Sequence, residues 1–510
     1  MDRNAFIKKF IFRISALLFV MSTIVGWFKI APDNVLLKLD TIFTQQEITG
    51  WGTSAAWWSQ IAGKSEKAED YAKLLYSKEG LGLNVYRYNV GAGEKDNPDS
   101  RIWDAENSWR AAESFLVYDE ATGEYKYDWT KDAAAQNMLD LCLSYGCIDT
   151  VVLFANSPHY SMCVSGQASG GLTPAASNLK KDCYDDFAEY MLDIAEYFIG
   201  KGVPVKYISP INEPQWDWGG EWVGQEGCHY EIDEVIEVGK AFAAEIKERN
   251  LDVKISLAES GQVGDHAMDC LDKIYENKDI VDVLGTYAYH SYWTDNNFQL
   301  KKAYGEYIER NYRDVELEMS EWCELPCQHT IDDIEGALIM ARTISEDVTL
   351  TGVNSWSSWV GVNQGGEYAD SMIAASDDCN SYEIAKRYYA MAHFTKFVPV
   401  GSHAVNFDVS IADLTAEEAW WKEEINGKEY PVYLIDNRLN VSAFKTPEGD
   451  YVVIVVNQGE EKDFTVAMPF FDVKAYTTDA ERNLELTHDS CGITTIDIPA
   501  KSITTIVFEK

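Results

Sequence analysis

Positive charge is scarce in this chain. Its 510 residues carry 43 Lys and Arg against 83 Asp and Glu, which gives a formal net charge of −40. Nucleic-acid binding depends on clustered Lys and Arg, so this balance argues against a nucleic-acid partner. It also argues against an anionic substrate or membrane surface, unless a local basic patch overrides the total. A neutral ligand fits the charge best.

Internal repeats and low-complexity linkers are also lacking. The hydrophobic content of 46% and charged content of 25% are those of a globular protein. A chain of this length is too long for one ordinary core, so two domains are expected. Because no flexible linker separates them, we expect the two domains to pack closely.

Aromatic residues, in contrast, are abundant, with 16 Trp and 29 Tyr. Flat rings stack on the apolar faces of sugars, which favours a carbohydrate ligand. Large domains bury many aromatic side chains in any case, so both explanations stay open for any single Trp.

The N-terminus resembles an export or anchor segment. Arg3, Lys8, Lys9 and Arg13 precede Ile14 to Phe28, a stretch without charge. A basic region followed by an apolar stretch of this length is typical of a signal peptide. The stretch is short for a membrane span, but no clear cleavage site follows, so an uncleaved anchor stays open. We therefore set residues 1–30 apart from the fold and expect a secreted or cell-surface-anchored chain.

Ten cysteines are present, and their pairing cannot be deduced from sequence. Cys323-x3-Cys327-x-His329 faintly resembles a metal-binding spacing, but no matching second pair follows. We therefore expect buried thiols or a local disulfide, and neither a metal nor another cofactor.

Apolar runs alternate with helical patterns between residues 47 and 396. Strands buried on both faces have near-continuous apolar runs, and strands separated by helices form parallel sheets. Four helical stretches are clear: Ala133 to Tyr145, Asp185 to Ile199, Ile232 to Arg249 and Ile331 to Leu350. The strand runs are Ile48 to Trp58, Leu83 to Gly91, Asp149 to Pro158, Val205 to Pro214, Val253 to Ser260, Val281 to Tyr292, Val315 to Trp322 and Gly352 to Val362. Eight such units predict a (β/α)8 TIM barrel of the α/β class.

Residues 397–510 have a different pattern, in which short strands are separated by turns. Tyr451 to Gly459 is typical of a strand followed by a turn, and Ser502 to Phe508 alternates near the end of the chain. This pattern predicts a C-terminal β-sandwich. Within residues 31–46, Val35 to Phe43 alternates too, with Leu36, Leu39 and Phe43 among polar neighbours. We expect it to join the sandwich as an extra strand.

A glutamate closes two of the strand runs. Glu213 ends the fourth run in Asn212-Glu213-Pro214, and Glu321 ends the seventh in Ser320-Glu321-Trp322. Reactions on this type of barrel take place at the carboxyl ends of the strands, so the two carboxyl groups should meet there. Two carboxylates on either side of one sugar can cleave a glycosidic bond, one as the acid and the other as the ionised partner.

Other glutamates need to be weighed against this pair. Glu259 also ends a strand, and Glu226 lies in the loop after the fourth one; either could be a structural ion-pair partner. Glu316 and Glu318 alternate with apolar neighbours, which indicates barrel or ion-pair positions. Glu213 differs because Asn212 can hold a substrate hydroxyl and Pro214 stiffens the turn.

These motifs together resemble glycoside hydrolase family 30. Gly50-Trp51-Gly52-Thr53-Ser54, Tyr86 to Gly91 and Asn156-Ser157-Pro158 are similar to its strand ends. Lys386 to Phe397 is similar to its junction between barrel and sandwich. The resemblance implies a retaining hydrolase with Glu321 as the nucleophile and Glu213 as the acid/base. Asn212 to Trp218, followed by Gln225 to His229, most resembles the β-1,6-galactanase branch.

The resemblance also implies a set of substrate-binding residues at the strand ends. Arg87 would keep Glu321 ionised, Tyr289 would orient it and Trp356 would form a stacking floor. His290 either lines the pocket or is a core histidine. The full set is Trp51, Arg87, Asn89, Ser157, Asn212, Trp216, Tyr289, His290 and Trp356. The expected partner is a neutral polysaccharide or oligosaccharide, with β-1,6-galactan first and β-1,6-glucan or an exo-acting β-glycosidase or xylanase activity as alternatives. A non-catalytic carbohydrate-binding protein is the alternative from another class.

Overall fold

The computed structural model describes residues 34–510 apart from 103, 105–107, 222–223, 412–419, 426–427, 434–438, 467 and 469. The predicted signal or anchor segment, residues 1–30, lies outside the described residues. Among the helices of the described part, none is long and apolar enough to cross a bilayer.

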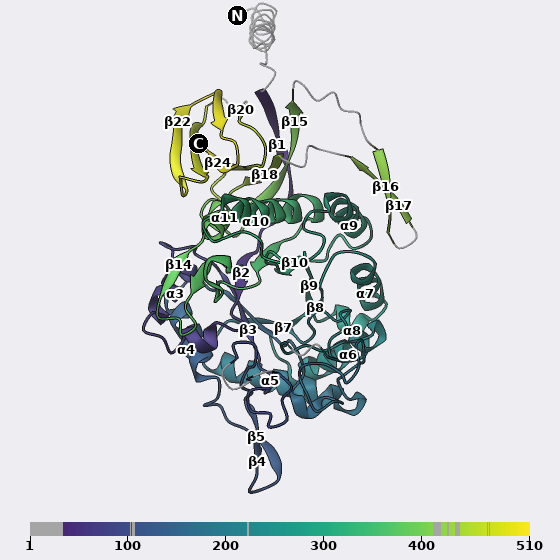
Figure 1. Cartoon of the computed structure of the whole chain (residues 1–510). Helices are drawn as coiled ribbons and strands as arrows, with labels where there is room; N and C mark the ends of the chain where they lie inside the picture. The colour runs from purple at the N-terminus through teal and green to yellow at the C-terminus, as the bar shows by residue number, and fades with distance from the viewer. Residues whose placement is uncertain are drawn as a thin grey trace, which may run out of the picture.

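Eight parallel strands close into a barrel (Figure 1). Each of the eight apolar runs contains one of them, so the predicted TIM barrel is confirmed. In chain order they are β2 (Gly50–Ser54), β3 (Val85–Asn89), β6 (Thr150–Phe154), β7 (Val205–Ser209), β8 (Lys254–Ser260), β9 (Leu284–His290), β10 (Leu317–Glu321) and β11 (Ser355–Ser358). Strand β11 pairs with β2, which closes the ring.

Helices surround the barrel and present their apolar faces to it. Helix α5 buries Phe187, Met191, Ile194 and Phe198, the side chains that recur at three- and four-residue steps. The helices are α2 (Ser59–Ala62), α3 (Ala68–Tyr76), α4 (Ala133–Ser144), α5 (Tyr184–Gly200), α6 (Ile232–Arg249), α7 (Asp265–Tyr275), α8 (Lys278–Val281), α9 (Phe298–Asn311), α10 (Ile334–Glu346) and α11 (Lys386–Thr395).

Helix α6 shows how local sequence fixes an element. It begins with a capping box, in which Glu231 and Glu234 each accept the other's backbone N–H. It ends at Asn250, whose left-handed conformation stops the helix. The bounds of α6 are those expected from the sequence.

The second domain is one nine-stranded sheet in the order β22-β21-β24-β19-β18-β15-β1-β20-β23. Side chains from opposite ends of the sheet, such as Val473 of β21 and Ile496 of β23, pack in the same core, so the sheet folds over as a sandwich. The strands are β1 (Asn34–Glu47), β15 (His403–Ile411), β18 (Leu439–Lys445), β19 (Tyr451–Asn457), β20 (Lys462–Val466), β21 (Asp472–Thr478), β22 (Glu485–Cys491), β23 (Thr494–Ile498) and β24 (Ser502–Glu509).

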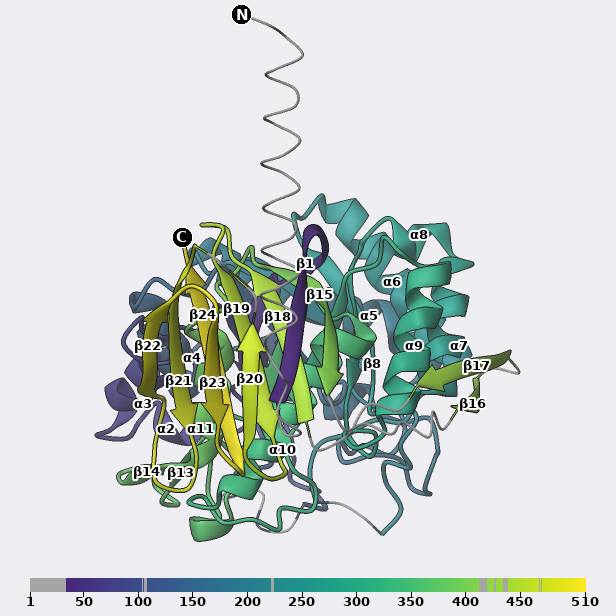
Figure 2. The ribbon, with the colours of Figure 1, turned by 90° about the horizontal axis from the view of Figure 1, so that it is seen from above.

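Strand β1 joins this sheet as expected, between β15 and β20 (Figure 2). Its buried side chains, however, include Val35 and Leu37, whereas Phe43 is 66% exposed. Leu36 and Leu39 are only partly buried. A register shift after Leu39 accounts for the exposure of Phe43: residues 40–43 leave the ladder, and Asp40 accepts the backbone N–H groups of Ile42 and Phe43.

The two domains share a continuous core. Phe444, Val452 and Ile454 of the sandwich belong to the same apolar cluster as the barrel, and α10 and α11 lie between the two. Buried His393 of α11 bonds Thr505 at 2.7 Å and Thr478 at 2.9 Å. Burial lowers the pKa of His393 to about 3, so it makes these contacts as a neutral ring. The expectation of close packing is confirmed.

Several smaller elements are inserted in the connections. A hairpin of β4 (Leu116–Asp119) and β5 (Glu124–Tyr127) stands out from the barrel on the side away from the sandwich (Figure 1). The others are β12 (Val362–Asn363), β13 (Ile373–Ala375), β14 (Tyr382–Ile384), β16 (Trp420–Ile425), β17 (Lys428–Tyr433) and the short helical turns η1 (Tyr160–Met162), η2 (Lys181–Cys183), η3 (Asp347–Thr351) and η4 (Gly366–Tyr368).

Candidate active site

A cavity of about 550 Å³ opens at the carboxyl ends of the barrel strands. Both Glu213 and Glu321 line it. Six tryptophans line it too: Trp57, Trp109, Trp216, Trp218, Trp293 and Trp359. The cavity therefore combines two acidic groups with extensive flat apolar surface, the pattern of a small-molecule site.

Glu213 follows β7 in a strained backbone conformation. Its φ is +47°, in the left-handed region that a residue with a side chain rarely adopts. The backbone N–H of Glu213 donates to the carbonyl of Glu259 at 2.9 Å, and Glu259 itself has a φ of +52°. Such strain costs about 1–3 kcal/mol at each residue and is typical of functional sites. It turns both carboxyl groups inward from adjacent strands.

Glu321 is the last residue of β10 and accepts two strong hydrogen bonds. Arg87 of β3 donates to Oε2 at 2.8 Å, and the hydroxyl of Tyr292 donates to Oε1 at 3.0 Å. Both donors are buried and reach Glu321 from other strands or connections. The carboxylate is thereby held in one orientation.

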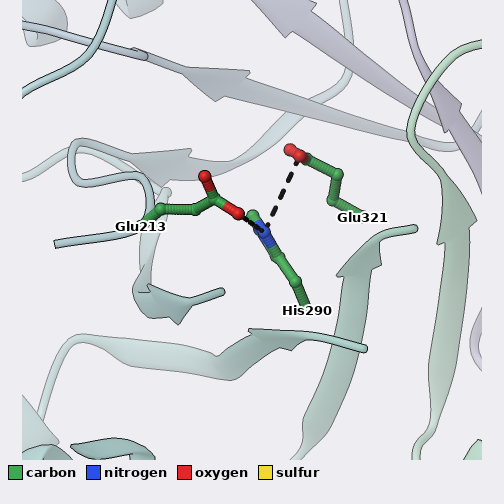
Figure 3. Close-up of side chains that lie close together, drawn as sticks. All are labelled: Glu213, His290 and Glu321. Carbon is green, nitrogen blue, oxygen red and sulfur yellow. Dashed lines mark hydrogen bonds and ion pairs between the residues drawn. The ribbon is translucent and has the colours of Figure 1, made fainter. Parts of the chain in front are cut away.

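His290, the last residue of β9, lies between the two candidate carboxylates (Figure 3). Its Nδ1 is 3.1 Å from Oε1 of Glu213 and 3.7 Å from Oε1 of Glu321. Its Nε2 is 3.0 Å from Oε2 of Glu259. Burial alone would lower the pKa of His290, but the carboxylates around it raise the pKa to about 10. The ring is therefore an imidazolium that donates from both nitrogens.

Glu259 is the buried counter-ion that completes this network. Arg87 donates to it at 2.8 Å, and the hydroxyl of Ser320 donates to it at 2.7 Å. Burial would raise its pKa, but Arg87 and His290 lower it to about 2. Glu259 is therefore ionised and carries no proton for chemistry.

The charges of the five groups nearly cancel. Two cations, Arg87 and His290, face the carboxyl groups of Glu213, Glu259 and Glu321. An unpaired charge is costly in a buried site, so one proton shared between Glu213 and Glu321 makes the cluster neutral. Burial raises the pKa of Glu321, while the charges of His290 and Arg87 act against the rise and that of Glu213 adds to it.

The two candidate carboxyl groups are close together. One oxygen of each, with a ring nitrogen of His290, lie within 4.8 Å of one another. Two carboxyl groups with oxygens this close are compatible with the roughly 5–5.5 Å separation of the carboxyl groups in retaining hydrolases. The same three atoms could in principle surround a metal ion. In this structure the hydrogen bonds of His290 to Glu213 and Glu259 account for the arrangement of the cluster.

Three residues expected at the site lie outside it. Side chains alternate along a strand, and Trp51, Tyr289 and Trp356 point away from the barrel interior. Trp51 donates to the carbonyl of Val398 at 2.8 Å, and Trp356 donates to Asp347 at 2.9 Å. The hydroxyl of Tyr289 lies 2.6 Å from that of Thr351. These residues therefore pack the barrel against its surroundings, and the expected binding roles for them were wrong.

The other expected residues lie at or beneath the cavity. Trp216 lines it. Arg87 and Asn212 lie below it, where Arg87 donates to Oδ1 of Asn212 at 3.0 Å. Asn89 and Ser157 are buried and do not line the cavity; Asn89 accepts from Asn156 at 3.1 Å, and Ser157 donates to the carbonyl of Pro158 at 3.2 Å.

Sequence reasoning missed Tyr292 and most of the tryptophans. Tyr292 follows the end of β9 by two residues, so it belongs to the loop and not to the strand pattern. Trp359 directly follows β11 and lines the cavity in place of Trp356. The eighth apolar run extends beyond its strand on both sides, so the sequence did not fix where the strand ends.

The remaining glutamates have structural positions. Glu318 lies inside the barrel and accepts from Thr286 at 3.1 Å; burial raises its pKa to about 7. Glu316 is exposed and directly precedes β10, at the end of the strand opposite to Glu321. Fully buried Glu226 accepts three backbone N–H groups, from Ala92, Glu94 and Ala112. It therefore ties the connection after β3 to the one after β7.

All ten cysteines are free thiols, and six of them are buried. Sγ of Cys323 is 3.5 Å from Asp370, whereas Sγ of Cys327 is 3.5 Å from the guanidinium of Arg387. The ring of His329 bonds Glu324 instead. Cys327 also lies 3.7 Å from Glu324, so it shares this partner with His329, whereas Cys323 does not. The expectation of buried thiols is met by Cys323, while Cys327 is half-buried.

Sequence comparisons agree with this geometry. Residues 34–294 match the profile of O-glycosyl hydrolase family 30, and residues 429–506 match that of the family 30 β-sandwich domain. An endo-β-1,6-galactanase of Hypocrea rufa is 27% identical over 237 residues, which cover 43% of this chain and 48% of the relative. An exo-β-1,6-galactobiohydrolase of Bifidobacterium longum is 27% identical over 225 residues, 34% of this chain and 14% of the relative. The chain thus spans about half the length of the first curated relative and less of the second.

Solved structures share the whole architecture. A conserved exported protein of Bacteroides fragilis is 25% identical, with a TM-score of 0.78 over 93% of this chain and 99% of the other. Xylanase C of Talaromyces cellulolyticus has a TM-score of 0.67 over 94% and 100%; at 15% identity, it shows the fold alone.

A closed barrel, an attached sandwich and a pair of strand-end glutamates define the class: carbohydrate-active (β/α)8 proteins of the glycoside hydrolase type. The family profile covers more than half of the chain. The chain belongs to glycoside hydrolase family 30.

Burial of Glu226 predicts a pH-dependent stability. Burial and the charge of Glu94 raise the pKa of Glu226 from 4.5 to about 8. The folded state then binds more protons than the unfolded state between these values, so stability falls as pH rises from 5 to 8. We measure the free energy of unfolding by chemical denaturation at pH 5 and at pH 8. Between these two pH values the decrease should be about 3 kcal/mol smaller in Glu226→Gln than in the wild type. Exposed Glu248→Gln is the control; an equal pH dependence in wild type and Glu226→Gln would contradict the prediction.

Proposed function

We propose that this protein is a retaining glycoside hydrolase that cleaves β-1,6-linked galactan by double displacement. Glu321 is the nucleophile and Glu213 the acid/base. The observation that carries this proposal is the pair itself: two carboxyl groups from β7 and β10 whose oxygens lie within 4.8 Å at the wall of one cavity.

In the first step, an ionised Oε of Glu321 forms a bond to the anomeric carbon. The bond from that carbon to the leaving oxygen breaks, and Glu213 gives its proton to this oxygen. In the second step, Glu213 takes a proton from water, the water oxygen bonds to the anomeric carbon and Glu321 leaves. Each step inverts the anomeric carbon, so the product keeps the β configuration.

The buried network supports both roles. Arg87 and Tyr292 donate hydrogen bonds that stabilise the negative charge of Glu321 before attack. They stabilise it again when the ester breaks and the carboxylate is released. His290 contacts both carboxyl groups, so its positive charge stabilises whichever of Glu213 and Glu321 is ionised at each step. Asn212 is held by Arg87 through its Oδ1, which leaves its amide nitrogen to donate to a sugar hydroxyl.

The cavity wall supports a neutral saccharide as the substrate. Six tryptophan rings offer flat surfaces, and Asp217, Gln225 and Asn363 supply polar groups for hydroxyls. Arg110 is the one basic residue among the described lining residues, which does not favour a polyanion. The two curated relatives act on β-1,6-linked galactan or galactobiose units by name, which supports the β-1,6-galactan proposal.

We further propose that the chain acts outside the cytoplasm, secreted or anchored at the cell surface. The basic and apolar pattern of residues 3–28 supports this placement. The similarity to an exported protein of Bacteroides fragilis is consistent with it.

Azide rescue tests the two roles separately. Each of Glu321→Ala and Glu213→Ala should lower turnover of β-galactan by about four orders of magnitude, because both steps need both groups. On an aryl β-galactoside with a good leaving group, azide should restore Glu321→Ala and give the α-galactosyl azide, since it attacks the substrate directly. With Glu213→Ala it should give the β-galactosyl azide, since it attacks the glycosyl-enzyme. NMR of the product distinguishes the two.

Exposed Glu316→Ala, one residue before the strand that ends in Glu321, is the matched control and should keep wild-type activity. The same azide anomer from both variants, or full activity without either carboxylate, would refute the assignment. Tight binding of galactan with no turnover by the wild type would favour a carbohydrate-binding protein instead.

Tyr292→Phe should shift the pH profile. Loss of the hydrogen bond to Glu321 removes about 1.5–2 kcal/mol of stabilisation of its charged form and so raises its pKa. The acid limb of kcat/KM should then move to higher pH, and kcat/KM at its optimum should fall by about tenfold. Tyr289→Phe, whose hydroxyl bonds Thr351 outside the barrel, should leave the limb in place. An unchanged limb for Tyr292→Phe would contradict the role given to this tyrosine.

A substrate panel separates the saccharides. β-1,6-galactan should be hydrolysed fastest, with β-1,6-glucan and xylan slower by at least about tenfold, and chromatography of early products distinguishes internal from terminal cleavage. If β-1,6-glucan or xylan were hydrolysed faster, the proposed substrate would be wrong, but the two-glutamate mechanism would still hold.

A further inference from the structure

The connection from β3 to α4 is unusually long. It runs over residues 90–132, whereas βα connections commonly have about 2–6 residues. It contains the β4–β5 hairpin, which stands out from the barrel opposite the sandwich (Figure 1). Long insertions of this kind are often binding elements.

A second cavity, of about 790 Å³, lies beside this hairpin. We call it the hairpin cleft. Three tyrosines line it: Tyr118 and Tyr125 from the hairpin, and Tyr160 from the connection after β6. Both connections leave the carboxyl ends of their strands, so the hairpin cleft opens at the same end of the barrel as the candidate active site.

The three rings form a cluster of edge-to-face contacts. The Tyr118 and Tyr125 ring centroids are 5.3 Å apart, those of Tyr125 and Tyr160 are 6.3 Å apart, and the latter hydroxyls are 3.5 Å apart. Tyr118 is 52% exposed and Tyr125 is 38% exposed. A cross-strand pair helps to stabilise a hairpin, but this role requires neither the third ring nor the open cleft beside it.

The polar lining indicates what the rings could bind. Asp99 and Glu120 are exposed at the hairpin cleft and can accept hydrogen bonds from hydroxyl groups. Asp96 is paired with Lys131 at 2.8 Å, which leaves the lining acidic overall. Acceptors beside flat rings suit a neutral polyhydroxylated ligand and repel a polyanion.

The same connection also reaches the candidate active site. Trp109 and Arg110 line the main cavity, while Asp96 to Asp99 line the hairpin cleft. Buried Glu226 holds the connection in place through Ala92, Glu94 and Ala112. Described residues of one connection therefore line both cavities.

We propose that the hairpin cleft is a second saccharide-binding site, which holds a remote part of the polysaccharide while another part occupies the active site. This proposal rests on the proposed function, since it takes the same class of ligand. Its effect should be confined to long substrates, because a short one cannot reach both cavities.

The test is the double substitution Tyr118→Ala/Tyr125→Ala. With β-1,6-galactan, KM should rise by about tenfold, which corresponds to about 1.4 kcal/mol of binding. With an aryl β-galactoside, kcat/KM should stay at the wild-type value. The double substitution Tyr118→Phe/Tyr125→Phe keeps both rings and should keep most of the affinity. Tyr275→Ala, which removes a 36% exposed tyrosine that packs on Tyr312 at 4.5 Å, is the matched control.

Binding is measured separately from turnover, by electrophoresis in gels that contain β-1,6-galactan, β-1,6-glucan or xylan. In a Glu321→Ala background, retardation should weaken when both tyrosines are alanine. The gel measures binding even if no polymer is hydrolysed. A cleft that does not bind saccharide can therefore be distinguished from an enzyme that does not act on galactan. Unchanged KM and retardation would overturn the proposal. An equal loss of activity on the polymer and the aryl glycoside would also overturn it, because the hairpin would then only support the active site.

Discussion

The buried guanidinium of Arg87 is the interaction on which the site depends. It reaches Glu259, Glu321 and Asn212 at 2.8–3.0 Å, and its Cζ lies 3.6 Å from the ring centroid of Phe154. Three carboxyl groups could not share such a small buried volume without cations, because their repulsion and desolvation would be too costly. Arg87 and His290 make this arrangement possible. With all three carboxyl groups ionised, the two cations leave the cluster with a net charge of −1. The cluster can therefore take up and release one proton, as acid/base chemistry requires.

The barrel and its two strand-end glutamates were predictable because the local hydrophobic pattern of each strand identifies the fold. Strands buried on both faces leave continuous apolar runs, and the carboxyl end of each run lies at the same end of the barrel. Glu213 and Glu321 are 108 positions apart, yet both end such a run, so their meeting required only the fold. The sandwich was predictable for a similar reason, since its short alternating strands differ from the barrel runs.

The wall of the cavity was less predictable. A shift of one residue along a strand turns a side chain from the inside of the barrel to the outside. An apolar run does not show which of its residues point inward. Trp356 and Trp359 illustrate the limit: both lie in one run, but only the residue beyond the strand lines the cavity. Tyr292 and Trp293 lie in a loop, where no periodicity exists to place them. Glu259 carries no sequence signal that separates a counter-ion from a catalyst, and its contacts decide the matter.

Strand β1 has a consequence for the order in which the chain is assembled during synthesis. It is the first strand of the described chain, yet both of its ladder partners lie far downstream, β15 from His403 and β20 from Lys462. The ribosome therefore releases the entire barrel before Val35 and Leu37 have anything to pack against. Domains generally fold as units as they emerge, so the barrel can close first, and the sandwich is the last part to form. A nascent chain stalled before His403 would carry the barrel strands with β1 still unpaired, a natural target for chaperones.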